Sequence, residues 1–161
     1  KRGGKARSIE NGRKYFSVFG IENKILEFKE SSATVELAAQ ALGCEPARIA
    51  KTLSFIVSEK PILILCAGDT KIENAKYKEF FKEKARMIQF DQVEHFIGHA
   101  PGGVCPFGIK EGVNIYLDES LKRFETVFPA CGSSNSAIEL NIADLEKYSN
   151  YKEWIAVTKE K

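Results

Sequence analysis

Three stretches of the sequence combine residue types that could act on an ester or a phosphate. Lys51 stands before an almost wholly apolar stretch, residues 52–57, so its ammonium must lie at the rim of a sheet or point into a cavity. Residues 99–108 hold three Gly and two Pro, which excludes a regular element and predicts a shaped loop. Residues 132–136, Gly-Ser-Ser-Asn-Ser, form a second polar turn that could offer hydroxyl and amide groups to a ligand.

The glycines of the first loop let its main chain approach a ligand closely. The N–H groups of Gly102 and Gly103 could therefore donate to an anion or to a carbonyl oxygen. The loop matches neither a P-loop, which needs Gly-Lys-Ser or Gly-Lys-Thr, nor a dinucleotide fingerprint. By residue type alone, an ordinary lysine at a sheet rim is the favoured interpretation of Lys51, and the loop could equally be an ordinary turn.

Cysteine and histidine offer a different chemistry. Cys105 could act as a nucleophile with His95 or His99 as its base, which would make the protein a cysteine-dependent hydrolase. The two histidines lie four residues apart, but Gly98 interrupts the helix between them and no third ligand is evident. We therefore expect no metal and no cofactor. The four cysteines match neither a metal knuckle nor a disulfide framework, so we expect reduced thiols and a cytoplasmic protein.

Length, composition and charge favour one globular domain. The chain has 161 residues, 43% of them hydrophobic and 29% charged, and no apolar run approaches the roughly 20 residues that cross a bilayer. Residues 1–14 hold six of the 24 Lys and Arg but one of the 22 Asp and Glu, which leaves the rest with 18 against 21. We expect a basic N-terminal arm, residues 1–14, flexible or not native to the chain, and one domain, residues 15–161. An acidic body disfavours general nucleic-acid binding, so any nucleic-acid partner must bind at a local site rather than over the whole surface.

Hydrophobic periodicity and turn residues predict a mixed sheet with helices around it. We expect helices over residues 8–19, 35–42, 73–84, 91–98 and 142–148. Thr34 and its neighbours provide a hydroxyl cap for the second helix, and Asp91 is expected to cap the fourth. Strands are expected at residues 25–28, 52–57, 62–67, 87–90, 113–117, 126–130, 137–140 and 154–158. Tight turns as well as helices join neighbouring strands, which favours an α+β fold.

Three motifs in sequence order resemble the YbaK/EbsC family of aminoacyl-tRNA editing domains. They are Ala50-Lys51-Thr52-Leu53, the loop from Gly102 to Gly108, and Gly132-Ser133 leading to Ile138-Glu139-Leu140. The resemblance runs from about Tyr15 to Leu145. It implies a single α+β domain with a mixed, barrel-like sheet surrounded by helices. It also implies a trans-editing deacylase that hydrolyses the ester of a mischarged tRNA, often tRNA for proline, alone or with prolyl-tRNA synthetase, and without a membrane partner.

The resemblance also implies roles for individual residues. Lys51 would hold a phosphate or ribose oxygen of the terminal adenosine, while Gly102 and Gly103 would stabilise the negative charge that forms on the carbonyl oxygen. No nucleophilic side chain is required, because in this family a neighbouring hydroxyl of the substrate helps to activate the water. Catalysis is thus assigned to Lys51 and Gly102. Substrate binding is assigned to Thr34, Thr52, Gly103, Val104, Cys105, Pro106, Gly132 and Ser133.

Three positions depart from the family pattern. Cys105 stands where many members carry Ser, and Ala137 replaces a common Asp. Thr34 aligns with a bulky aromatic residue that lines the pocket of cysteine-editing members. The edited amino acid therefore stays open, as do two other functions: a noncatalytic module of the same fold that binds aminoacyl-tRNA or a synthetase, and the hydrolase that uses Cys105. Unaltered Lys51 and Gly102 favour the deacylase.

Overall fold

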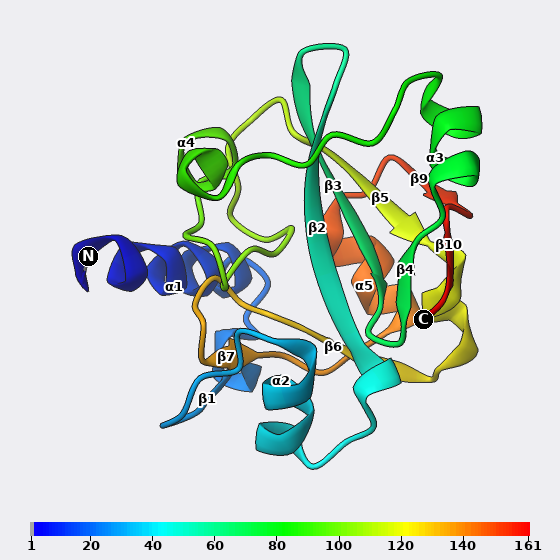
Figure 1. Ribbon diagram of the computed structural model, residues 1–161. Coiled ribbons are helices and arrows are strands. Elements are labelled where there is room, and N and C mark those ends of the chain that lie inside the picture. Colours follow the sequence, from blue (N-terminus) through cyan, green and yellow to red (C-terminus); the bar gives the residue numbers. More distant parts are fainter. Residues whose placement is uncertain (1) are drawn as a thin grey trace.

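A computed structural model describes residues 2–161 of the chain, with side chains from residue 9 onward. It shows a single α+β domain built on a curled, mixed half-barrel sheet, as the sequence predicts (Figure 1). The six strands of this sheet lie in the order β8-β6-β2-β3-β5-β9. Their bounds are β2 Ile49–Val57, β3 Lys60–Ala67, β5 Asn114–Asp118, β6 Thr126–Pro129, β8 Leu140–Asn141 and β9 Glu153–Ile155.

Two small sheets and five α-helices complete the described part of the chain. One small sheet pairs β1 (Leu26–Glu27) with β7 (Ser136–Ala137), and the other pairs β4 (Thr70–Ile72) with β10 (Thr158–Glu160). The helices are α1 Arg2–Ser17, α2 Val35–Leu42, α3 Asn74–Phe81, α4 Val93–Ile97 and α5 Ile142–Ser149. None of these helices is long and apolar enough to cross a membrane.

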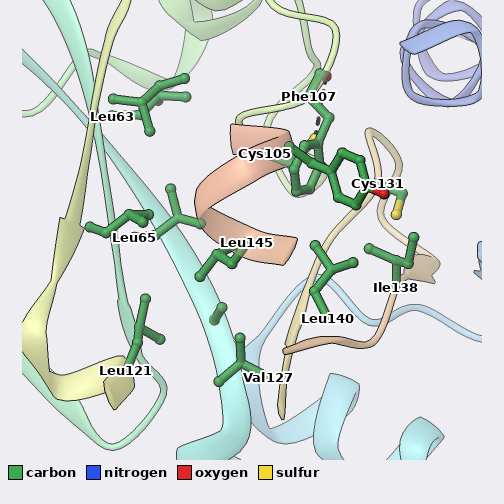
Figure 2. Packing of buried hydrophobic residues seen from close by; sticks show 14 of the residues in the cluster. Leu63, Leu65, Cys105, Phe107, Leu121, Val127, Cys131, Ile138, Leu140 and Leu145 are labelled. Carbon is green, nitrogen blue, oxygen red and sulfur yellow. Dashed lines mark hydrogen bonds between the residues drawn. The ribbon is translucent and has the colours of Figure 1, made fainter. Parts of the chain in front are cut away.

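The hairpin of β2 and β3 is the centre of the domain. Its two-residue turn places Ser58 and Glu59 at φ 49° and 68°, the left-handed conformation that matches the twist of a tight hairpin. Strand β3 is nearly all apolar because both of its faces are covered. Leu63 and Leu65 pack with Leu145 of α5 in the larger core cluster, as Figure 2 shows, and the alternate residues of β3 pack against α3.

Two predicted regions after α3 differ in the structure. Residues 87–90 form no strand, because only Met87 makes a bridge, to Phe55, before the chain turns away. The predicted helix over residues 91–98 is a 3-10 turn over Phe90–Gln92 followed by the short α4. Asp91 lies inside that turn and does not cap the helix. Residues from both places line the cavity described below.

Two predicted strands near the C-terminus are each divided in the structure. Residues 137–140 contribute the end of β7 and the start of β8, and residues 154–158 contribute parts of β9 and β10. Each pair of short strands belongs to two different sheets, so the chain must turn between them. The hydrophobic pattern alone does not contain that information, because both halves are apolar and partly buried.

The first helix begins earlier than its predicted start at residue 8 and ends at Ser17. Within the basic segment, Asn11 donates from its side chain to the carbonyl of Gly98 at 3.3 Å. A Cβ on Gly12 would lie 2.2 Å from the carbonyl oxygen of Cys131, so the helix touches the body closely there. The border between an arm and a domain at residue 15 stays a prediction.

A buried carboxylate holds the C-terminal segment to the main sheet. Asp118, at the end of β5, is 1% exposed. Its oxygens accept hydrogen bonds from the N–H of Val157 at 2.9 Å, the hydroxyl of Thr158 at 2.7 Å and the N–H of Ser120 at 3.0 Å. These bonds fix the start of β10, which pairs with β4.

The three bonds of Asp118 predict the effect of replacing it. Asp118→Asn replaces one of the two accepting oxygens with an NH₂ group, which cannot accept a hydrogen bond. At least one of the three donors therefore loses its acceptor. We expect a loss of about 1–3 kcal/mol in the free energy of unfolding, measured by urea denaturation. Glu119→Gln, an exposed neighbour, is the control and should unfold as the wild type does. Equal urea midpoints for the Asp118 variant and the wild type would contradict the structural role of this carboxylate.

Candidate functional site

A mostly apolar cavity of about 490 Å³ opens beside β2. Its walls come from the N-terminal end of α2, from β2, from residues 87–93, from the glycine-rich loop and from β7. Phe128 of β6 and Ile49 of β2 also line the cavity, and α2 packs on both. This volume falls in the range of small-molecule binding sites.

Five of the ten predicted site residues line this cavity: Thr34, Lys51, Thr52, Gly102 and Val104. Thr34 also caps α2, because its hydroxyl oxygen accepts from the N–H of Leu37 at 3.1 Å. Ala137, one of the positions that depart from the family pattern, lies on the wall as well. Gly103, Cys105, Pro106, Gly132 and Ser133 lie outside the lining.

Lys51 lies opposite Cys66 in the β2–β3 hairpin and projects toward the turn between β3 and β4. Its ammonium donates a hydrogen bond to the carbonyl oxygen of Thr70. Burial lowers the pKa of Lys51, and the negative charges of Cys66, when ionised, Asp69 and Glu36 act in the opposite direction. The lysine is therefore half-buried and held by a main-chain oxygen rather than by a carboxylate.

The carbonyl of Thr70 is itself fixed from two sides. The hydroxyl of Thr70 donates to the carbonyl of Ala67 at 2.7 Å, which closes the turn. Next to it, Asp69 forms a two-pronged ion pair with Arg123, at 2.6 and 3.1 Å. The pairing of β4 with β10 holds the following residues. The acceptor that orients Lys51 is thus part of a rigid turn.

The two loops predicted to bind substrate meet each other. Gly102 has φ +91°, which L side chains rarely adopt. A Cβ on Gly103 would lie 2.6 Å from main-chain atoms of Gly132 and Ser133, so only glycine permits this contact. The N–H of Gly103 donates to the carbonyl of Ala100 at 3.1 Å. The prediction that Gly103 offers a free N–H donor is therefore wrong. The N–H of Gly102, in contrast, has no partner among the described residues.

The serine-rich loop uses its hydroxyls internally. Ser133 contacts the side-chain oxygen of Asn135 at 2.9 Å and the hydroxyl of Ser136 at 2.8 Å. The amide of Asn135 donates to the carbonyl of Phe28 at 2.7 Å. These bonds bind the loop to the segment before α2, and they set Ser136 and Ala137 in the wall of the cavity.

Cys105 is fully buried in the core (Figure 2). It is not among the residues that line the cavity. Its sulfur lies 3.5 Å from Nε2 of His99. That nitrogen is 2.6 Å from the carbonyl oxygen of Phe107, which can only accept, so Nε2 carries the proton and cannot take one from the thiol. Burial raises the pKa of Cys105 to about 12. The pair lacks both the thiolate and the base of a cysteine hydrolase.

Most of the cavity wall was not predicted from the sequence, and Met87, Phe90, Phe128 and Ser136 are among the residues that were missed. Met87 is 58% exposed and Phe90 is 78% exposed, so both lie at the mouth. The sequence signal that could have found Phe90 is an aromatic residue that follows a basic segment, residues 82–86. Among the side chains described, no group of three metal-ligating residues comes together.

Comparisons with known proteins agree with this arrangement. The family model of the aminoacyl-tRNA editing domain matches residues 29–148. "Uncharacterized protein YwhH" of Bacillus subtilis is 50% identical over 154 residues, which cover 95% of this chain and 98% of that protein. The "Putative Cys-tRNA(Pro)/Cys-tRNA(Cys) deacylase EbsC" of Enterococcus faecalis is 26% identical over 84% of this chain and 85% of that protein.

A solved structure extends the likeness to the whole fold. The "Crystal structure of a putative trans-editing enzyme for prolyl tRNA synthetase" has a TM-score of 0.84 and 26% identity to this chain, covering 96% of it and 98% of the other. The family match spans Lys51 and both loops of the site. The resemblance seen in the sequence is thereby confirmed: the chain belongs to the YbaK/EbsC family of aminoacyl-tRNA editing domains.

Proposed function

We propose that this protein is a trans-editing deacylase that hydrolyses the ester of a mischarged aminoacyl-tRNA, with tRNA for proline as the expected carrier. The observation that carries the proposal is the cavity, whose lining brings together Lys51, Gly102 and an apolar wall, the N–H of Gly102 having no partner among the described residues. Family membership supports the substrate class, and the names of two relatives mention tRNA(Pro) or prolyl-tRNA synthetase.

The residues of the site fit the hydrolysis of an ester by water. The water oxygen bonds to the acyl carbon, the bond from that carbon to the ribose oxygen breaks, and the ribose oxygen takes up a proton. Negative charge on the carbonyl oxygen needs a donor such as the N–H of Gly102. Lys51 exchanges its bond to Thr70 for a phosphate or ribose oxygen of the terminal adenosine and orients the ester. A hydroxyl of the substrate ribose helps to activate the water.

The wall of the cavity favours a small, uncharged amino acid. Thr34 and Ala137 are small, and Val104, Ile49 and Phe128 are apolar. Lys51 is the one charged side chain that lines the cavity in the described part of the chain, and it is assigned to the adenosine. An acidic or basic side chain would therefore be buried without a partner, which is costly.

A panel of mischarged tRNAs tests the proposed activity. We expect release of the amino acid from tRNA(Pro) that carries alanine or cysteine, and slow release from tRNA(Pro) that carries proline. The measurement is the fraction of labelled amino acid that remains attached over time, compared with spontaneous hydrolysis. If the protein accelerates release from no member of the panel, the noncatalytic binding module replaces the deacylase.

Lys51 is predicted to be essential for this activity. Lys51→Ala removes the cation that orients the terminal adenosine, so deacylation should fall by about tenfold to 100-fold while the circular dichroism spectrum stays unchanged. Lys60→Ala, at the exposed end of the same hairpin, is the matched control and should keep the wild-type rate. A folded Lys51→Ala protein that deacylates at the wild-type rate would show that Lys51 is only a lysine at the sheet rim.

The thiols are predicted to be dispensable. Burial raises the pKa of Cys105 to about 12 and that of Cys66 to about 11, so both stay protonated at pH 8, and iodoacetamide should label the native protein at Cys44 alone. Cys105→Ser should deacylate within a few fold of the wild-type rate. Complete loss of activity in that variant, together with a trapped acyl-thioester in the wild type, would establish the cysteine mechanism instead.

A further inference from the structure

Strand β2 has two different partners along the edge that faces away from β3. At its start, Ala50 pairs with Pro129 of β6. Near its end, the N–H of Ile56 donates to the carbonyl of Arg86 at 2.9 Å, and the carbonyl of Ser54 accepts from the N–H of Ile88 at 3.1 Å. Neither partner reaches the residue between them, Thr52.

The alternation of a strand decides which main-chain groups point into this gap. The main-chain groups of successive residues point to opposite edges of a strand. Because Ser54 and Ile56 bond away from β3, Thr52 must point its N–H and C=O the same way. Within residues 2–161, β6 pairs with β2 only at Ile49 and Ala50, and neither group of Thr52 bonds to a residue outside the strands.

The side chain of Thr52 shows the same lack of partners. Its hydroxyl oxygen is buried and makes no hydrogen bond to any described residue. Thr52 also lines the cavity in which the ester is expected to react. Buried polar groups are normally paired, and the hydroxyl breaks this rule. With the two main-chain groups that face the same cavity, it gives a ligand three unpaired groups on one residue.

An aminoacyl ester carries the matching groups. Its α-ammonium is a donor, its acyl carbonyl oxygen is an acceptor, and one Cα separates them, as in a residue of a peptide. In an antiparallel sheet, two directly opposed residues can exchange two N–H···O bonds. A single aminoacyl group can therefore form such a pair with Thr52, without any further strand.

We propose that the aminoacyl group binds as a one-residue strand opposite Thr52. The α-ammonium donates to the carbonyl of Thr52, and the N–H of Thr52 donates to the acyl carbonyl oxygen. This inference rests on the proposed deacylase function. It assigns a binding partner to the α-amino group, for which the site predicted from the sequence named no residue. It also gives the reacting carbonyl a second donor beside Gly102, in place of Gly103, whose N–H is bonded to Ala100.

Two RNA ligands that differ in one group test the pairing. Both are acceptor-stem hairpins of tRNA(Pro) with a 3′-amino-3′-deoxyadenosine end, acylated through a stable amide with either alanine or propionic acid. The propionyl hairpin lacks only the α-ammonium. We expect it to bind at least about tenfold more weakly in calorimetric titrations, the loss of one charge-assisted hydrogen bond. Equal affinity, or no binding of either hairpin, overturns the proposal.

Variants separate the main chain of Thr52 from its side chain. Thr52→Val keeps the N–H and C=O and should keep the preference for the alanyl hairpin. Thr52→Pro removes the N–H and should weaken binding of both hairpins by about tenfold. Thr52→Val is the matched control for Thr52→Pro because it keeps the N–H at the same position, and the comparison requires that Thr52→Pro keep the circular dichroism spectrum of the wild type. Loss of the preference in Thr52→Val would assign recognition to the hydroxyl and overturn the main-chain pairing.

The amide signal of Thr52 in the ¹⁵N-labelled wild type keeps the proposal testable if Thr52→Pro does not fold. Addition of the alanyl hairpin should shift that signal downfield, and an unmoved signal at saturation would contradict the pairing.

Failure of the deacylase function is distinguishable from failure of this inference. Hydrolysis of mischarged tRNA with equal affinity for the two hairpins removes the inference alone. A tenfold preference without hydrolysis leaves the pairing intact and removes only the activity.

Discussion

The second edge of β2 is the constraint on which the site depends. β6 follows this edge only as far as Pro129, whose carbonyl then accepts from the N–H of Ile138. The chain after Pro129 bends into the serine-rich loop, where Gly132 and Ser133 meet Gly103 at main-chain contact distance. On the other side of the gap, residues 86–88 join β2 only from Ser54 onward. The cavity occupies the interval that these two partners leave.

Two consecutive residues of β2, Lys51 and Thr52, consequently contribute different groups to the site. The side chain of Lys51 lies on the face of Cys66 and reaches the carbonyl of Thr70, in a turn that β10 and the Asp69–Arg123 ion pair hold in place. The main chain of Thr52 points along the sheet plane into the cavity. A strand can thus offer a cation and a donor–acceptor pair from adjacent positions, because side chains and main-chain groups project at right angles. The C-terminal segment contributes by fixing the acceptor of the lysine.

Much of this arrangement was predictable from local sequence, and the rest depends on contacts between distant segments. Apolar alternation and glycine placement are local, so the β2–β3 hairpin, α2 and the glycine-rich loop were predicted correctly. The division of residues 137–140 between two sheets was not, because it depends on β1 and β6 as partners. Cys105 and Gly103 sit in the predicted loop, yet burial beside His99 and contact with Gly132 give them packing roles that no spacing reveals. The unpaired edge at Thr52 could not be predicted either, because it depends on where β6 and residues 86–88 stop pairing with β2.

Amide hydrogen exchange along β2 of the free protein tests the central claim most directly. The N–H groups of Ala50 and Ile56 lie in paired stretches, whereas that of Thr52 points into an open cavity with no partner in the described chain. We expect exchange at Thr52 to be much faster than at Ala50 and Ile56, measured residue by residue by NMR. Exchange at Thr52 as slow as at its two paired neighbours would show that the edge is closed, and would contradict the account.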